Sequence, residues 1–496
     1  MTSVAVPSFD LSPTRLSYVA ALRGVVPRAA DASYTYAQTG PLDAESLICL
    51  AASNPTGHFY GLETTATIAQ DAQALAKARG VGNISFSDTL SFLPEKIDVL
   101  CCDAATQGQT DDQRAEFFDI ADKYVPAGGL CAYRYRTAAS PRERLRFLIQ
   151  ENLATLTPQL AKELAADLKV LGSLYFAAHK SDLDAMDEAE KAGRLVDYFT
   201  ALAKEGLATS GAFDAFKDFA SRAFSLAGDA DIAANYINLA APSKAHDLLT
   251  ACATNGHLHT ESIKDFAVHR EVRSDIWVRL PIDQSSDSVA LFNPFTFGLA
   301  MRRENLPTSL TAQGGAIINL TTPLYAKLID LMALMPIGIG DFLAHPSGKG
   351  FTPDEVVVAV QLLAAFGVAG PMRGRFEGSA ANINAPQAAW AVPFNEHFAT
   401  KPITTSSVRL ASSIVGSSIV LPVREALVLQ AIVREGLVNC AGGVMNEMNR
   451  LIRDNPTLAA QVMEAAEPND EIVRNVVTSV MTVNTPRWYT YGLLAA

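Results

Sequence analysis

Short β-type runs alternate with helical runs along the first part of this chain, and this alternation limits the fold more than any other feature. The β-type runs are residues 34–38, 58–62, 84–87, 97–102 and 130–134. Helical runs lie between them, at residues 44–52, 67–79 and 113–123. Strands joined by helices lie parallel, because a parallel return needs about a dozen or more residues. We therefore predict a doubly wound, Rossmann-like α/β domain at residues 1–139.

A change of pattern follows at residue 140, where β-branched runs stop and runs rich in Ala, Leu, Lys and Glu take over. The pair Thr157-Pro158 is typical of the first turn of a helix, and Ser140-Pro141 begins the region in the same way. Glycines separate the runs, which indicates several helices with short connections. The sequence predicts a helical middle domain at residues 140–270.

Strand and helix patterns mix again after residue 270. Strands are expected at residues 276–280, 289–292 and 316–320. Helices are expected at residues 323–335, 353–366, 424–436, 444–453 and 458–464, and Thr352 begins the second of them as a cap. We predict a mixed α+β domain at residues 271–496.

Composition excludes several classes of partner and compartment. The chain has 40 basic and 52 acidic residues and a net charge of −12, so no attraction to nucleic acid is expected. Its most apolar stretch, residues 356–372, contains Gln361, Gly367 and Pro371, so no membrane insertion is expected. The six cysteines lack disulfide or zinc spacing, and the first residues lack the pattern of a secretory signal. We expect a cytoplasmic protein.

A metal site is not predicted either. His257 and His259 form a close histidine pair, but the sequence places no Cys or third His at ligand spacing from them.

Acidic and glycine residues follow the predicted strands at the places where such a domain binds its ligand. Doubly wound sheets bind ligands at the carboxyl ends of their strands. Gly40 and Asp43 lie in the first loop, Glu63 follows the second strand, and Asp88 and Asp103 follow the next two. Glu63 stands where a ribose hydroxyl would need an acceptor.

Three of these residues also have a simpler interpretation. Glu63 fits an ordinary polar residue at a strand end, Asp88 a turn or cap residue, and Asp103 a loop acid. Cys101 and Cys102 fit the interior of a buried strand better than a reactive thiol, because no histidine or basic residue stands beside them in the sequence.

The order of these strand-end motifs resembles the class I S-adenosylmethionine-dependent methyltransferases. Residues 55–63 resemble the second strand of that fold, which ends in an acidic ribose ligand, here Glu63. Residues 125–130 resemble the Pro-x-Gly-Gly turn before its fifth strand. Further segments resemble a narrower group that carries a methyltransferase regulatory domain, namely residues 11–16, 22–27, 264–270 and 273–279.

The resemblance implies an activity, a cofactor and partners. That group includes bacterial lysine methyltransferases that modify outer-membrane proteins, so a protein lysine acceptor and a homodimer are implied. S-adenosylmethionine is the implied cofactor, and residues 140–270 and 271–496 would be the two halves of the regulatory region. The implied cofactor contacts are Gly40, Asp43, Glu63, Asp88 and Asp103. No residue is identified as a catalytic base.

The first loop departs from the family pattern, which is an acidic residue followed by Gly-x-Gly-x-Gly. Counting back from Glu63 places Gln38 at the acidic position and Gly40, Leu42 and Ala44 at the glycines. Leu42 would project near the space for the methionine part of the cofactor, and Gln38 removes a charge partner for its ammonium group. Two hypotheses stay open: a methyltransferase, or a pseudoenzyme that serves as a binding or scaffolding module.

A third class, the nicotinamide-dependent oxidoreductases, is disfavoured because no Gly-x-Gly-x-x-Gly follows the first strand.

Overall fold

The structure is a computed structural model of the 496-residue chain. It describes residues 11–29, 31–40, 42–105, 111–137, 145, 149, 156–172, 176–203, 212–252, 257–268, 270–374, 388–400, 403, 407–436, 441–454 and 470–495. The helix starts predicted at residue 140 and at residue 458 lie outside these ranges, as do the side chains of His257 and His259.

The chain forms two compact units, each of which combines separate segments of sequence. Residues 1–101, 283–308 and 320–496 form the first unit. Residues 102–282 and 309–319 form the second unit.

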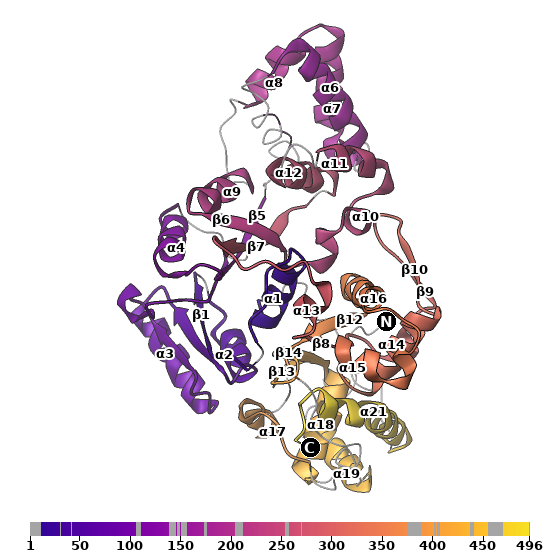
Figure 1. Cartoon of the computed structure of the whole chain (residues 1–496). Helices are drawn as coiled ribbons and strands as arrows, with labels where there is room; N and C mark the ends of the chain where they lie inside the picture. Colours follow the sequence, from indigo (N-terminus) through magenta and orange to yellow (C-terminus); the bar gives the residue numbers. More distant parts are fainter. Residues whose placement is uncertain are drawn as a thin grey trace. The chain divides into compact units, whose positions relative to one another are not determined.

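A seven-stranded sheet in the order β3-β2-β1-β4-β5-β7-β6 is the central feature of the fold (Figure 1). Its strands are β1 (Tyr34–Thr39), β2 (Gly57–Leu62), β3 (Ile84–Ser87), β4 (Val99–Asp103), β5 (Leu130–Arg136), β6 (Phe224–Asp229) and β7 (Val272–Arg279). β2 pairs in parallel with β1 and β3, whereas β7 is antiparallel to β5 and β6. The predicted Rossmann-like α/β fold and its first five strands are confirmed.

The helices of the first part of the chain include the three that the sequence predicts, each beginning within two residues of its predicted start, and one, α1, that it does not predict. They are α1 (Pro13–Ala21), α2 (Ala44–Ala52), α3 (Ala66–Ala78) and α4 (Asp111–Tyr124). Side chains of Asp43 and Thr65 cap α2 and α3 by accepting main-chain N–H groups of the first turn. α2 then packs against β2 and α3 against β3, so the two helices cover the strands whose carboxyl ends form the predicted site.

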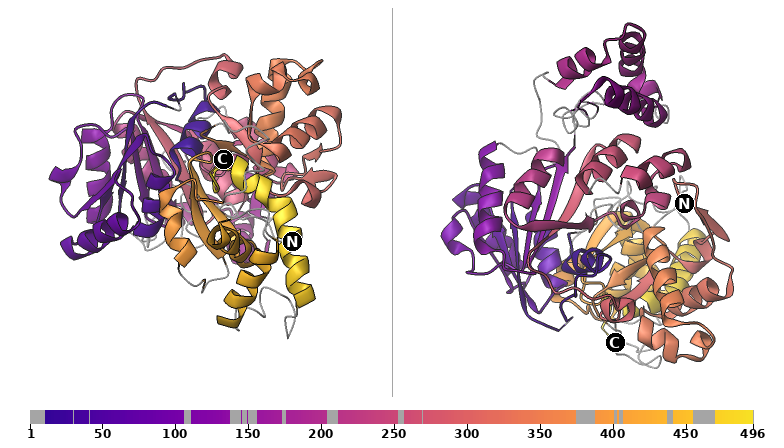
Figure 2. Two further views of the ribbon diagram at one scale, coloured as in Figure 1. Left: turned by 90° about the horizontal axis from the view of Figure 1, so that it is seen from below. Right: turned by 45° about the horizontal axis from the view of Figure 1, so that its top comes forward.

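The region predicted as helical contains one of the sheet's strands. Its helices are α6 (Pro158–Gly172), α7 (Phe176–Lys191), α8 (Leu195–Ala203), α9 (Ala212–Ser221), α10 (Ile237–Ala240), α11 (His246–Cys252) and α12 (His257–Ala267). Figure 2 shows α6, α7 and α8 side by side, and Phe199 is buried in their common core. The Thr157 cap of α6 is confirmed, because its hydroxyl accepts the N–H of Leu160 at 3.2 Å.

The prediction of helices alone is wrong at β6. This strand has no β-branched residue, so its sequence gives little local preference for a strand. Its pairing with β7 stabilises it. The sheet therefore takes two strands, β6 and β7, from beyond residue 139, while the division of the chain at residues 139 and 270 stays a prediction.

Residues beyond β7 form small sheets and helices, as predicted. The helices are α13 (Ser288–Phe292), α14 (Pro323–Leu334), α15 (Ile339–Ala344), α16 (Pro353–Ala365), α17 (Glu396–Thr400), α18 (Val423–Glu435), α19 (Ala441–Asp454) and α21 (Asp470–Thr490). The strands are β8 (Thr296–Leu299), β9 (Ser309–Thr311), β10 (Ile317–Asn319), β11 (Ile337–Gly338), β12 (Ala369–Met372), β13 (Ser407–Ser412) and β14 (Ser417–Pro422). β11, β8 and β12 form a three-stranded sheet, and β13 pairs with β14.

Two local predictions in this part have opposite outcomes. Thr352 and Glu355 form a capping box at the start of α16, as predicted. The strand predicted at residues 289–292 is instead part of α13, because Asp287 accepts the N–H of Ala290 at 3.0 Å and caps a helical turn. A short apolar run such as this one does not distinguish strand from helix by periodicity.

Candidate functional site

Glu63 directly follows β2 and is the most unusual polar residue at the predicted site. Its side chain is only 6% exposed. Among the described residues, no group forms a hydrogen bond with its Oε1 atom. Burial raises the pKa of Glu63, although a main-chain hydrogen bond from Thr64 opposes the shift. A buried carboxylate oxygen without a partner is costly, so this one is available to accept a hydroxyl group.

A second unpartnered polar atom lies at the end of the neighbouring strand. Thr39 is the last residue of β1 and is 4% exposed, and within the described ranges its Oγ1 atom has no hydrogen-bond partner. Thr39 pairs in register with Leu62, the residue before Glu63. Gly40 follows with a φ of +89°, a conformation that glycine adopts without strain. The carboxyl ends of β1 and β2 thus carry two buried polar atoms that a ligand could satisfy.

The departures from the family loop lie at this same edge. A Cβ atom added at Gly61 would lie 3.2 Å from a methyl carbon of Leu42, so the leucine side chain covers the end of β2. Gln38 pairs in register with Gly61, and Ala44 is the first residue of α2. The loop therefore presents an apolar side chain and a neutral amide where the family pattern has glycine and an acid.

Asp43 and Asp88 lie near this edge, and both side chains are exposed. Asp43 caps α2 through the N–H of Ser46 at 3.3 Å, and its exposed carboxylate lies 3.9 Å from Arg409. Asp88 directly follows β3, and its side chain is exposed. A helix cap therefore describes the contacts of Asp43.

Asp103 is the last residue of β4 and belongs to the second unit. Its Oδ2 atom lies 2.9 Å from Nη1 of Arg134 on β5. Its Oδ1 atom accepts the N–H of Ala105 at 3.2 Å. This carboxylate already has a cation and a main-chain donor as partners.

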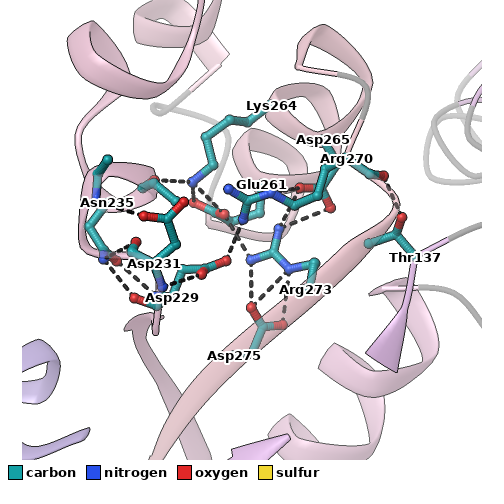
Figure 3. Close-up of polar contacts among 12 residues, drawn as sticks. Thr137, Asp229, Asp231, Asn235, Glu261, Lys264, Asp265, Arg270, Arg273 and Asp275 are labelled. Atoms are coloured by element: carbon teal, nitrogen blue, oxygen red, sulfur yellow. Dashed lines mark hydrogen bonds and ion pairs between the residues drawn. The ribbon is translucent and has the colours of Figure 1, made fainter. Parts of the chain in front are cut away.

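The second unit contains a buried cluster of charged residues around Arg273, which we call the ion cluster (Figure 3). Its members are Asp229, Glu261, Lys264, Asp265, Arg270, Arg273 and Asp275. Arg273 on β7 has no exposed side-chain surface and donates to three carboxylates. Its N–O distances are 2.9 Å to Asp265, 2.9 Å to Glu261 and 2.8 Å to Asp275.

Other contacts satisfy the remaining groups of the ion cluster. Lys264 lies 2.6 Å from a carboxylate oxygen of Glu261 and donates to the carbonyl of Ala234 at 2.9 Å. Arg270 pairs with Asp229 at the end of β6. Outside the cluster, the hydroxyl of Tyr135 on β5 donates to Asp275 at 2.6 Å. The ion cluster thereby joins α12 to the ends of β5, β6 and β7.

Pairing and burial act against each other on the acids of the ion cluster. Burial alone would raise the pKa of Glu261, but the charges of Lys264 and Arg273 outweigh it and lower the pKa to about 2. Burial raises the pKa of Asp275 to about 6, although Arg273 opposes the shift. Each acid of the cluster has charged or hydroxyl partners, and these contacts tie α12 to the strands.

Several residues of the ion cluster lie in segments that the sequence analysis singled out, but their ion pairs were not predicted. Residues 264–270 and 273–279 carried the family resemblance, but their charges were not paired with one another. A signal was present, because Arg273 and Asp275 are two residues apart on a strand and so share a face. Glu261 and Asp265 are four apart on a helix and also share a face.

Among the described residues, no group of three or more His, Cys, Asp or Glu residues is arranged to hold a metal ion. Nor does any helix in those ranges have the length and apolar character needed to span a membrane.

Comparison with known proteins places part of the chain in a described family. Residues 205–279 match the family described as a predicted methyltransferase regulatory domain. This segment includes β6, α12 and β7, and with them every member of the ion cluster. Among proteins of curated function, no sequence matches this chain significantly.

Comparison of structures extends the likeness over nearly the whole chain. The structure of PKMT2 from Rickettsia typhi matches with a TM-score of 0.60 and 14% identity, over 98% of this chain and 98% of that chain. The structure of PKMT2 in complex with AdoHcy matches with a TM-score of 0.62 and 13% identity, over 98% of this chain and 99% of that one. The chain has the class I S-adenosylmethionine-dependent methyltransferase fold, and its residues 205–279 match a predicted methyltransferase regulatory domain.

Proposed function

We propose that this chain is an S-adenosylmethionine-dependent methyltransferase whose cofactor lies at the carboxyl ends of β1, β2 and β3. The observation that carries the proposal is the buried Glu63 carboxylate, whose Oε1 atom has no partner among the described residues. A carboxylate at the end of the second strand suits the hydroxyl pair of a ribose, because it accepts from both hydroxyls. The PKMT2 structure with AdoHcy supports this choice of cofactor.

The residues present fit the nucleoside part of the cofactor better than its methionine part. Glu63 and Thr39 offer polar atoms at the strand ends, and Asp88 stands after β3 for an adenine contact. Leu42 and Gln38 stand where the family resemblance expects the methionine part. We therefore expect affinity to rest mainly on the adenosine group, so that adenosine fragments bind nearly as well as the whole cofactor.

We propose a lysine of a protein as the methyl acceptor. The likeness to PKMT2 over 98% of the chain supports it, together with the resemblance of residues 264–270 and 273–279 to a group that includes bacterial lysine methyltransferases. Bound S-adenosylmethionine would supply an electrophilic methyl group, which bonds to the neutral lysine nitrogen while the carbon–sulfur bond breaks and its electron pair stays on sulfur. The chain's own contribution is to position the two reactants. A homodimer belongs to the same proposal.

The pseudoenzyme hypothesis rests on one specific observation, the composition of the first loop. Gln38, Leu42 and Ala44 replace the acid and two glycines of the family pattern. If this hypothesis is right, the unmodified chain binds no cofactor. Binding would then appear only in the triple variant Gln38→Asp, Leu42→Gly, Ala44→Gly.

Calorimetric titration with S-adenosylmethionine, S-adenosylhomocysteine and adenosine tests the proposal. We expect saturable binding to the unmodified chain and a loss of about tenfold to a hundredfold in Glu63→Gln, because hydrogen bonds to a charged group are lost. Glu95→Gln is the matched control, since Glu95 is exposed in the loop before β4. Binding by the triple variant alone would contradict the proposal and support the pseudoenzyme.

The acceptor needs a separate experiment. The chain is incubated with methyl-labelled cofactor and a bacterial protein extract, and the labelled protein is hydrolysed to amino acids. We expect label in methyllysine. With Glu63→Gln we expect no label when the cofactor concentration is below the raised dissociation constant of this variant. Label in another amino acid would contradict the lysine acceptor and leave the cofactor site intact.

A further inference from the structure

A cavity of about 100 Å³ lies in the first unit, between β8, β12, β14 and α21. This volume is several times the roughly 10–15 Å³ that one water molecule needs on the same measure. Apolar side chains form most of its wall, including Leu299, Met372, Leu421 and Trp488. The elements around it carry the orange and yellow colours in Figure 1. Size and lining suit a small organic molecule.

One polar side chain in the wall lacks the partner that its burial requires. Asn484 on α21 lines the cavity and is only 2% exposed. Over the ranges that the structure describes, no acceptor forms a hydrogen bond with its Nδ2 atom. A buried amide donor without an acceptor costs about 1–3 kcal/mol. An acceptor atom on a molecule inside the cavity would remove this cost.

The charge of the wall favours an anion. Arg487 lies one helical turn after Asn484, lines the same cavity, and donates to the main-chain oxygen of Leu299, a contact that leaves its positive charge in place. Glu425 also lines the cavity, but Arg302 neutralises it at an N–O distance of 2.6 Å. No described carboxylate pairs with Arg487 within 4.0 Å. The wall therefore combines an amide donor with a net positive charge.

We propose that this cavity binds a small apolar monocarboxylate. Its carboxylate accepts a hydrogen bond from Nδ2 of Asn484 and faces the charge of Arg487, while its apolar body packs against Trp488 and the strand residues. The proposal does not depend on the cofactor site, which lies at the ends of β1, β2 and β3.

Binding of two probes to the full chain, hexanoate and 4-phenylbutanoate, tests this site. We expect each to saturate in calorimetric titration and to raise the melting temperature. Hexan-1-ol has the same apolar body as hexanoate without the charge. We expect it to bind more weakly than hexanoate by a factor of at least about ten. Hexylamine carries the opposite charge and should not bind.

Two variants distinguish this site from nonspecific binding. Asn484→Leu keeps the branched shape of the side chain and removes the donor, so hexanoate should bind about tenfold more weakly. Asn305→Leu is the control at an exposed asparagine of the same unit, and it should bind as the unmodified chain does. Ser418→Phe, on the partly exposed part of the wall, fills the cavity and should abolish binding even if Asn484→Leu fails to fold.

Two results would overturn the proposal. If neither carboxylate saturates at millimolar concentration, water alone occupies the cavity. If hexanoate binds Ser418→Phe as tightly as the unmodified chain, it binds elsewhere.

Discussion

Glu63 and Glu261 are both buried glutamates, with 6% and 7% of their surface exposed, but their surroundings are opposite. Glu261 has Lys264 and Arg273 as partners, and its pKa falls to about 2. Glu63 has an oxygen atom without a partner in the described part of the chain, and burial raises its pKa. The difference separates a carboxylate that holds the fold together from one that is available to a ligand.

The largest expected effect is at the centre of the ion cluster. Arg273→Met leaves three buried carboxylates without their shared cation, so the free energy of unfolding should fall by about 3–5 kcal/mol. Urea denaturation measures it. Arg303→Met is the control, since Arg303 forms an exposed pair with Asp330, and it should change the free energy by less than about 1 kcal/mol. Equal effects of the two variants would mean that the buried ion pairs of Arg273 contribute no more to stability than the exposed pair of Arg303.

The pH dependence of stability should differ in sign between the two glutamates. Glu261 has a pKa lowered from 4.5 to about 2, so its contribution is complete above pH 4.5 and is lost as the pH falls toward 2. That loss is about 3 kcal/mol for a shift of this size. Glu63 has a raised pKa, so its contribution is complete below pH 4.5 and is lost as the pH rises through the raised value.

Unfolding free energies at a series of pH values, compared between the unmodified chain and each Glu→Gln variant, isolate these contributions. The difference for Glu261→Gln should shrink as the pH falls below 4.5. A difference that grows instead would mean that Glu261 is not held by its cations in solution.

A smaller effect is expected from the hydroxyl that supports the ion cluster. Tyr135→Phe removes the hydrogen bond to Asp275 and leaves that buried acid with Arg273 alone. We expect a loss of about 1–3 kcal/mol in thermal or urea unfolding. Tyr124→Phe, at a half-buried tyrosine of α4, is the control and should have no measurable effect. No loss in Tyr135→Phe would mean that Arg273 alone satisfies Asp275.

The smallest effect on stability is expected at Glu63. Glu63→Gln removes a buried charge that has an unpartnered oxygen, so the free energy of unfolding at pH 7 should stay the same or rise by up to about 1 kcal/mol. Under the proposed function the same variant should also weaken cofactor binding, and the two results together would mark Glu63 as a ligand contact. A loss of stability as large as that of Arg273→Met would make Glu63 a structural residue.

Much of the sheet could be predicted because its signals are local. The first five strands alternate with capped helices, and residues such as Asp43 and Thr65 mark where the helices begin. β6 could not be predicted this way, because its residues have little strand propensity and its stability comes from pairing with β7.

The candidate site was predictable in position but not in state. The place of Glu63 follows from the strand before it, whereas its missing partner depends on every side chain around it. Asp43 and Asp103 follow the same rule. Their places were predicted, whereas their contacts with Arg409 and Arg134 come from residues distant in the sequence. The pairing of Arg273 likewise depends on the approach of α12, which no local pattern encodes.

The interleaving of the two units has a consequence for synthesis on the ribosome. The second unit needs residues 309–319, so it remains incomplete until the hairpin of β9 and β10 has left the exit tunnel. The first unit needs residues 320–496, so its opening 101 residues wait for nearly the whole chain. The second unit can therefore finish folding before residues 320–496 have been translated, whereas the first unit stays incomplete and leaves apolar surface exposed until that last segment has emerged.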